Sequence, residues 1–281
     1  MHTSQSRRPT SPRELTAHAA TFLLLCLVAE TASAQDMRVF TTVSSVATET
    51  NRHEAISHSL TLFHAGRVYD YMEDVGEVVI FEPAQNRFMI LGGNYSATEV
   101  QFAELHQFLD AAQEKAREYV AELRRDTNPQ QQRKATGIEF QMNPQLRSSF
   151  DDGQQLLQLS GEMLSYEVRT GSPPDEEFAV RYLDYADWAA RLNYVLHPHS
   201  VYPTARLEMN RELRTRHLLP VSVDLSARWD TPVRLRADHD FRPLQSVDRK
   251  LISRWEQQLK SEDTQWVTFH EYQRKLLTAK R

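Results

Sequence analysis

The first half of the chain alternates between short apolar runs and turn residues, a pattern typical of consecutive antiparallel strands. Strands are expected at residues 37–47, 56–63, 67–72, 77–81 and 87–91. Turn signals near residues 66, 75 and 85 separate the last four strands, at the spacing of about ten residues that a β-meander has. The strands at 77–81 and 87–91 are apolar on both faces, so we expect a further layer to cover the second face.

A long amphipathic helix is expected after this meander, over about 97–125. Residues Ser96 and Glu99 fit a capping box, and apolar residues from Leu105 to Leu123 recur at three- and four-residue steps. This helix is the expected cover of the meander. The polar residues 126–134 that follow predict a loop.

The rest of the chain again shows strand patterns followed by helix patterns. Alternation predicts strands at 138–142, 154–159, 162–169, 221–225 and 233–236, and helical periodicity predicts helices at 175–196, 203–217 and 246–260. Residues 266–277 are ambiguous, with a helix preferred. The order predicts an α+β fold, in which a curved antiparallel β-sheet made of β-meanders is covered by amphipathic helices.

The N-terminal segment has the three parts of a cleavable signal peptide. Arg7, Arg8 and Arg13 are basic, residues 19–29 are apolar, and residues 32–34 (Ala-Ser-Ala) form a small-residue cleavage site. The apolar run of 11 residues is short for a membrane span, which needs about 20. We therefore expect residues 1–34 to be removed and the protein to be exported, to the periplasm or the medium.

Two further regions are expected after the signal peptide. Residues 35–170 should form the antiparallel sheet with its covering helix. Residues 171–281 should supply helices and a β-hairpin that pack on the same domain.

Composition narrows the chemistry of the exported chain. The one cysteine, Cys26, lies within the expected signal peptide, so the mature chain would have neither a disulfide nor a thiolate site. The formal net charge of −5 argues against nucleic-acid binding through a basic surface. No later apolar stretch approaches the length of a transmembrane segment.

Histidine pairs are the candidates for a metal site. His197 and His199 form a His-x-His pair at the end of an expected helix, but two histidines fall short of the three protein ligands of a catalytic zinc. His53, His58 and His64 lie around one strand. The favoured interpretation of both groups is structural, with no metal and no cofactor.

No recognised catalytic motif occurs in the chain. Gly-x-Ser-x-Gly, Ser-x-x-Lys, His-Glu-x-x-His and glycine-rich phosphate loops are all absent. Asp238-His239-Asp240 could orient a histidine between carboxylates, but we favour a strand that leaves the sheet into solvent. No catalytic residue is assigned. A hydrolase with an unrecognised site would need His197, His199 and Asp240 to converge.

Aromatic residues are the candidates for ligand binding. Tyr69 and Tyr71 share one face of their strand, opposite Asp70. Tyr182 and Tyr185 belong to the apolar stripe of the helix at 175–196 and are expected in the core. Trp188 is offset from that stripe, which makes it the better candidate for a pocket contact.

The order of residues 63–71 (FHAGRVYDY), then 77–81 and 88–91, resembles that of uncharacterised exported bacterial proteins. More loosely, residues 37–170 are similar to the periplasmic lipoprotein carriers of the LolA type. In that family a curved antiparallel sheet covered by helices holds acyl chains. The strands that are apolar on both faces, the covering helices and the lack of a recognised catalytic motif predict a non-enzymatic exported protein that binds an apolar small molecule or a partner protein of the cell envelope. A structural or interaction protein of the envelope remains the other alternative.

Overall fold

One sheet of twelve strands organises the part of the chain that the computed structural model describes, residues 36–47, 50–92, 95–197, 200–229 and 232–279. The expected signal peptide, residues 1–34, lies outside these residues. The strands are β1 (Met37–Val46), β2 (His53–His64), β3 (Arg67–Met72), β4 (Glu77–Glu82), β5 (Arg87–Leu91), β6 (Ser96–Gln101), β7 (Arg147–Asp151), β8 (Leu156–Ser160), β9 (Leu164–Gly171), β10 (Leu219–Arg228), β11 (Pro232–Pro243) and β12 (Gln265–Trp266).

The strand β1 lies in the middle of the sheet, although it is the first strand of the described residues. The sheet order is β12-β6-β5-β4-β3-β2-β1-β11-β10-β9-β8-β7. All neighbouring pairs are antiparallel except β12 with β6. β1 pairs with β11 from Met37 opposite Pro243 to Ser45 opposite Leu235. The N-terminal meander and the C-terminal strands therefore belong to one continuous sheet.

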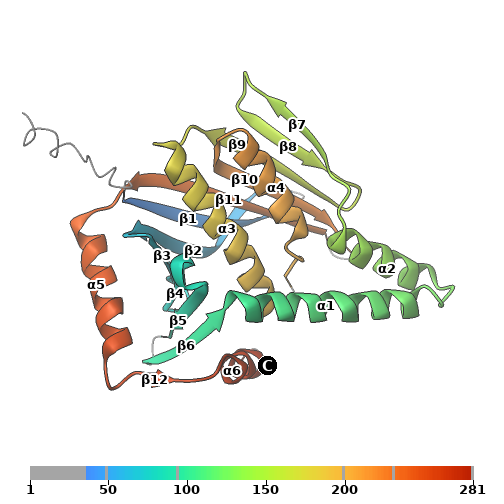
Figure 1. The fold of residues 1–281 in the computed structure, drawn as a ribbon. Helices are drawn as coiled ribbons and strands as arrows, with labels where there is room; N and C mark the ends of the chain where they lie inside the picture. Colours follow the sequence, from blue (N-terminus) through green and yellow to red (C-terminus); the bar gives the residue numbers. More distant parts are fainter. Residues whose placement is uncertain (1–35, 48–49, 93–94, 198–199, 230–231, 280–281) are drawn as a thin grey trace, which may run out of the picture. The chain divides into compact units, whose positions relative to one another are not determined.

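Helices lie against both faces of this sheet, which confirms the α+β class. Figure 1 shows the strand direction turning between β11 and β6, so the sheet is curved. None of the helices in the described ranges is long and apolar enough to cross a membrane. The α-helices are α1 (Phe102–Leu123), α2 (Pro129–Met142), α3 (Glu176–Leu196), α4 (Thr204–Thr215), α5 (Ser246–Lys260) and α6 (Phe269–Ala279), and a short 3-10 turn, η1 (Pro83–Gln85), joins β4 to β5.

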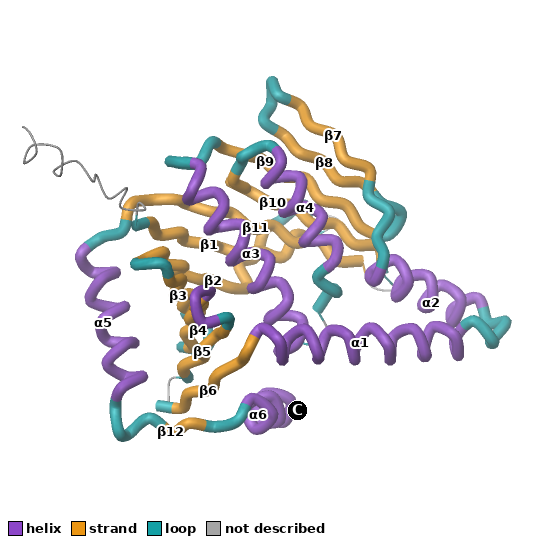
Figure 2. Tube along the Cα trace, in the orientation of Figure 1, coloured by secondary structure: helices purple, strands orange, loops and turns teal. Residues whose placement is uncertain are grey.

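The alternation of side chains divides the sheet into two apolar faces. The inner face, which includes Val79, Phe81 and Ile90, packs with α1, α3 and α6 in the main core. The outer face of β2 to β6 packs under α5, and its buried residues are Leu60, Leu62, Tyr69, Val78, Ile80, Met89, Leu91 and Ala97. The central strands are thus buried on both sides, as their unbroken apolar runs predict. Figure 2 shows α5 apart from α3 and α4, which lie together.

The predicted start of the first helix is wrong by five residues. Residues 96–101 form β6, which pairs with β5 along its length, and the helix begins only at Phe102. The expected capping box at Ser96 and Glu99 therefore lies within a strand. The open edge of β5 needs a hydrogen-bonding partner, and the buried Thr98 and Val100 of this segment suit a strand.

The predicted loop at 126–134 and strand at 138–142 are also wrong, because a helix, α2, covers most of both. Asn128 caps this helix by accepting a hydrogen bond from the Gln130 N–H at 2.9 Å, and Pro129 occupies its first turn. The alternation at 138–142 masks a helical spacing, in which Ala135, Ile138 and Met142 pack on the end of α1.

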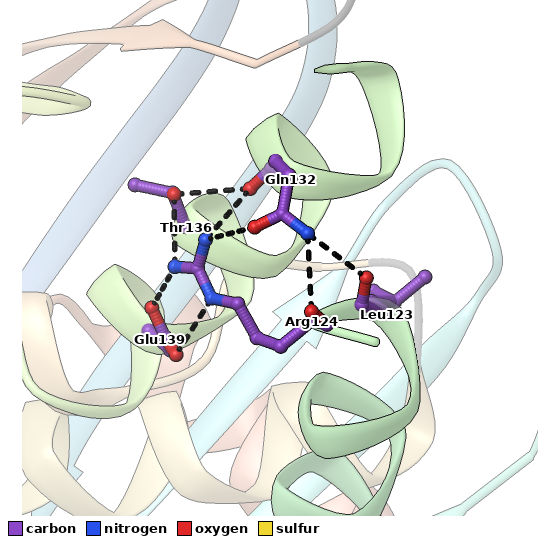
Figure 3. A network of polar contacts seen from close by, with 5 residues as sticks. All are labelled: Leu123, Arg124, Gln132, Thr136 and Glu139. Carbon is purple, nitrogen blue, oxygen red and sulfur yellow. Dashed lines mark hydrogen bonds and ion pairs between the residues drawn. The ribbon is translucent and has the colours of Figure 1, made fainter. Parts of the chain in front are cut away.

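An arginine at the end of α1 holds α2 in place. Arg124 donates to Gln132 Oε1 at 2.9 Å and to Thr136 Oγ1 at 3.0 Å, and it forms an ion pair with Glu139 (Figure 3). Gln132 in turn donates to the Leu123 carbonyl. The two helices form an antiparallel hairpin through this network.

Other sequence predictions agree with the structure. The strands β1 to β5 and the hairpins of β8 with β9 and of β10 with β11 lie where alternation places them, except that β11 continues seven residues beyond its predicted end at 236. The helices α3, α4 and α5 match the predicted ranges within two residues at each end. The ambiguous segment after residue 265 contains the short strand β12 and then the helix α6.

Candidate functional site

A cavity of about 420 Å³ lies between the inner face of the sheet and helix α3. Strands β1, β2, β3, β9, β10 and β11 contribute to its floor, and α3 with the start of α4 forms its roof. Its walls are mostly apolar, with a few polar groups placed among them. This volume and this lining are those of a small-molecule binding site, which typically spans about 300–1,000 Å³.

Three alanines on α3 leave this space open. Asp175 begins the helix by accepting a hydrogen bond from the Phe178 N–H at 2.6 Å. Further along the helix, Ala186, Ala189 and Ala190 face the cavity at helical spacing. Larger side chains at these positions would fill the space. The helix therefore carries bulky residues where it packs on the sheet and small ones over the cavity.

The carboxyl group of Asp70 is the buried acid of this site. Its Oδ1 accepts a hydrogen bond from Thr61 Oγ1 at 2.8 Å, and its Oδ2 accepts one from the Tyr185 hydroxyl at 2.6 Å. Burial raises the pKa of Asp70, and the two hydrogen bonds oppose this rise. Burial and the neighbouring Asp70 hold the pKa of Tyr185 well above its ordinary value. Asp70 thus forms a polar anchor between β3 and α3, and in the part of the chain that the structure describes it makes no ion pair.

Replacing Asp70 with asparagine should raise the free energy of unfolding at neutral pH by about 1–3 kcal/mol, because it removes a buried charge that no ion pair among the described residues neutralises. The pKa of Asp70 is raised above its unfolded value near 3.8, so the folded protein binds more protons and its stability falls as the pH rises through the raised pKa. The difference in the free energy of unfolding between Asp70→Asn and the wild type should therefore shrink as the pH is lowered from 8 to 4. Urea denaturation across this range measures it.

The exposed Asp152 provides the control, because Asp152→Asn should change stability little at every pH. A variant of Asp70 that is less stable than wild type throughout the range would contradict the prediction. That result would mean that Thr61 and Tyr185 need the ionised carboxylate.

A neutral histidine lies at the β11 side of the cavity. Burial, with a smaller contribution from Arg206, lowers the pKa of His239 to about 3. Its Nδ1 lies 3.0 Å from Thr41 Oγ1, and its Nε2 is buried with no hydrogen-bond partner among the described residues. His239 is thus uncharged at physiological pH. The interpretation of residues 238–240 as a strand leaving into solvent is wrong, because β11 continues to Pro243 and this histidine faces the core.

The two tyrosines predicted as ligand contacts lie away from this cavity. Tyr69 and Tyr71 share a face, as predicted, but that face is the outer one. Both rings pack on Trp255 of α5, at centroid distances of 6.2 and 5.8 Å, and the Tyr69 hydroxyl donates to Glu256 at 2.8 Å. These side chains join α5 to the sheet.

The predicted pocket contact of Trp188 is a packing contact between helices. Its ring stacks on that of Phe102 at a centroid distance of 3.7 Å, and the Arg191 guanidinium lies over the same ring at 5.2 Å from its centroid. The residues that line the cavity are instead Tyr182 and Tyr185, which were expected to be core.

The histidine pair and Asp240 do not form a site in the described residues. His197 follows the last residue of α3, and His199 lies outside the described residues. Asp240 is on the opposite face of β11 from Phe241 and pairs with Arg242 at 2.8 Å. Phe241 contacts Tyr182, and the end of α3 is about 20 Å further along the helix at 1.5 Å per residue. No group of three potential metal ligands occurs in the described ranges.

The residues that shape the cavity carry weak sequence signals. Asp70 is a charged residue on a strand face shared with Val68 and Met72, which is unusual for a buried strand. The run of alanines on α3 is a second signal, because small residues at core-facing positions leave space. Nothing in the sequence singles out Arg206, since the pattern of α4 is that of an ordinary amphipathic surface helix.

No known protein family matches the chain, and no curated protein matches it.

Proposed function

We propose that the protein is exported and binds an apolar small molecule in the cavity between the inner face of the sheet and α3, without chemical conversion of the ligand. The observation that carries the proposal is the cavity itself, about 420 Å³ with mostly apolar walls. A water-filled apolar space of this size would be unfavourable unless a ligand occupied it. Export is supported by the signal-peptide pattern of residues 1–34.

The polar groups in the cavity support binding better than catalysis. Asp70 has both oxygens engaged in hydrogen bonds, and His239 is held neutral beside Thr41. Acyl transfer needs a nucleophile hydrogen-bonded to a base that a third group orients. Among the described residues, neither Asp70 nor His239 belongs to such an arrangement. The likeness of residues 37–170 to the LolA-type carriers agrees with an apolar ligand and with a place in the cell envelope.

A tryptophan at position 189 tests the proposal. Ala189→Trp should fill the cavity and weaken binding of the neutral dye N-phenyl-1-naphthylamine by at least about tenfold, or 1.4 kcal/mol. Titration of the dye by fluorescence, with native mass spectrometry of the purified protein for a co-purified ligand, measures this. The matched control is Val180→Trp, on the same helix at a side chain that is 45% exposed.

Equal dye binding by Ala189→Trp and the wild type would reject the cavity as the site. Failure of the wild type to bind either the dye or a co-purified ligand would reject the proposed function as a whole.

A further inference from the structure

The first turn of α4 forms part of the cavity wall and has no side-chain cap. Val201, Tyr202, Pro203 and Arg206 line the cavity at this point. The N-cap residue of the helix is Pro203, which offers no side-chain acceptor, and the first turn contains no acidic residue. The first N–H groups of a helix lack intrahelical partners and carry partial positive charge. This end of α4 therefore favours a negative group in the cavity.

Arg206 adds a full positive charge at the same place. Within the described residues its guanidinium has neither a hydrogen bond nor an ion pair, and it is the one permanent cation among the cavity's described lining residues. Its charge acts on Tyr166, Tyr182 and His239, so all three lie around it. A cation beside apolar walls is costly without a counter-charge.

Asp70 does not supply that counter-charge. Among the described residues no ion pair joins it to Arg206, and its carboxyl oxygens accept hydrogen bonds from the neutral hydroxyls of Thr61 and Tyr185 instead. The charged group left without a partner among the described lining residues is thus the half-buried Arg206, and the nearby His239 Nε2 is a buried polar atom without a partner there. A ligand with a negatively charged group would supply the counter-charge that Arg206 lacks.

We infer that the cavity binds an amphipathic anion, with its negative head group held by Arg206 and the first turn of α4 and its apolar body against α3 and the inner face of the sheet. Tyr182 flanks the head group, and the alanines at 186, 189 and 190 receive the apolar part. The inference rests on the proposed function and specifies the ligand class for the same site. A carboxylate and a phosphate monoester share the required chemistry.

A comparison of ligands with one chain length tests the inference. Dodecanoate and dodecyl phosphate carry a negative head group, 1-dodecanol carries none, and dodecyltrimethylammonium carries a positive one. In competition with N-phenyl-1-naphthylamine, the wild type should bind at least one anion about tenfold or more tightly than the alcohol, as a charge-assisted hydrogen bond implies. The tighter of the two anions identifies the head group.

Arg206→Met should weaken binding of that anion about ten- to a hundredfold and leave the affinity for 1-dodecanol unchanged. Retained binding of the alcohol also shows that the variant is folded with an intact cavity. The control is Arg211→Met, on the same helix, where the side chain is 65% exposed and pairs with Glu208.

Two results would overturn the inference. One is equal binding of the alcohol and both anions by the wild type, and the other is preferred binding of the ammonium compound. In both cases the cavity binds a ligand, so the proposed function would stand while the anionic head group would be rejected. An absence of binding by all four compounds and the dye would reject the proposed function first.

Discussion

Replacing Trp255 with alanine is expected to lower the free energy of unfolding by about 3–5 kcal/mol, the range for a buried aromatic side chain. Trp255 is 6% exposed and lies under α5 against Tyr69 and Tyr71 of β3. It fills the centre of the contact between α5 and the outer face of the sheet. Its loss would leave a cavity over strands whose outer face has no other helix in the described residues. Urea or guanidinium denaturation followed by circular dichroism measures the change.

Val247 provides the matched control on the same helix. Its side chain is 53% exposed, so Val247→Ala should change stability by less than about 0.5 kcal/mol. A loss below about 1 kcal/mol for Trp255→Ala would show that α5 contributes little to the stability of the sheet. In that case the sheet would keep most of its stability without the packing of α5.

Replacing both Arg67 and Arg87 with methionine is expected to cost about 3–5 kcal/mol, because it leaves a buried carboxylate unpaired. The carboxylate is that of Glu82, whose side chain is 2% exposed. Arg67 Nε lies 2.8 Å from its Oε1, and Arg87 Nε lies 2.7 Å from its Oε2. The two arginines also pair with Glu256 of α5 and Glu99 of β6, so the group joins four strands, β3 to β6, and a helix. Chemical denaturation measures the loss.

Adding Glu82→Met to this double variant should recover most of the lost stability. An apolar replacement of a whole buried ionic group is often neutral or stabilising, because no charge is left without a partner. Arg117→Met is the control, since Arg117 and its partner Glu114 are 59% and 65% exposed and should contribute less than about 1 kcal/mol. A triple variant no more stable than the double would trace the loss to the packing of the arginine side chains.

Hydrophobic periodicity correctly predicted the strands and helices whose apolar positions coincide with the faces that they bury. The β-meander follows from short apolar runs between turn residues, and the helix α5 follows from helical spacing, because it buries one stripe. The need for a second covering layer over 77–81 and 87–91 was also correct. The sequence did not reveal that α5 provides it, because α5 is more than 150 residues away along the chain.

The errors arise where long-range pairing outweighs local preference. Residues 96–101 have the features of a helix start, but the unpaired edge of β5 recruits them as a strand. Residues 138–142 alternate, yet the capped start at Asn128 and the contact with the end of α1 make them helical. Local patterns cannot show which edges or faces remain to be filled.

The cavity was harder to predict than the fold, because it depends on where side chains are too small to fill the space between the sheet and α3. Tyr182 and Tyr185 read as core residues, and they are buried, but they also border the open volume. Trp188 reads as an available aromatic, yet Phe102 covers it. Arg206 lines the cavity only because α4 packs over the sheet. Local sequence patterns do not show how α4 packs.

The central position of β1 has a consequence for the synthesis of the chain. Its partner on one side, β2, follows at once, but its other partner, β11, ends at Pro243. At about 5–20 residues per second a ribosome needs roughly 10–40 s to make the intervening chain. For that interval β1 has an unpaired edge, which is the kind of surface that promotes aggregation. The two halves of the sheet can join only after β11 has been made.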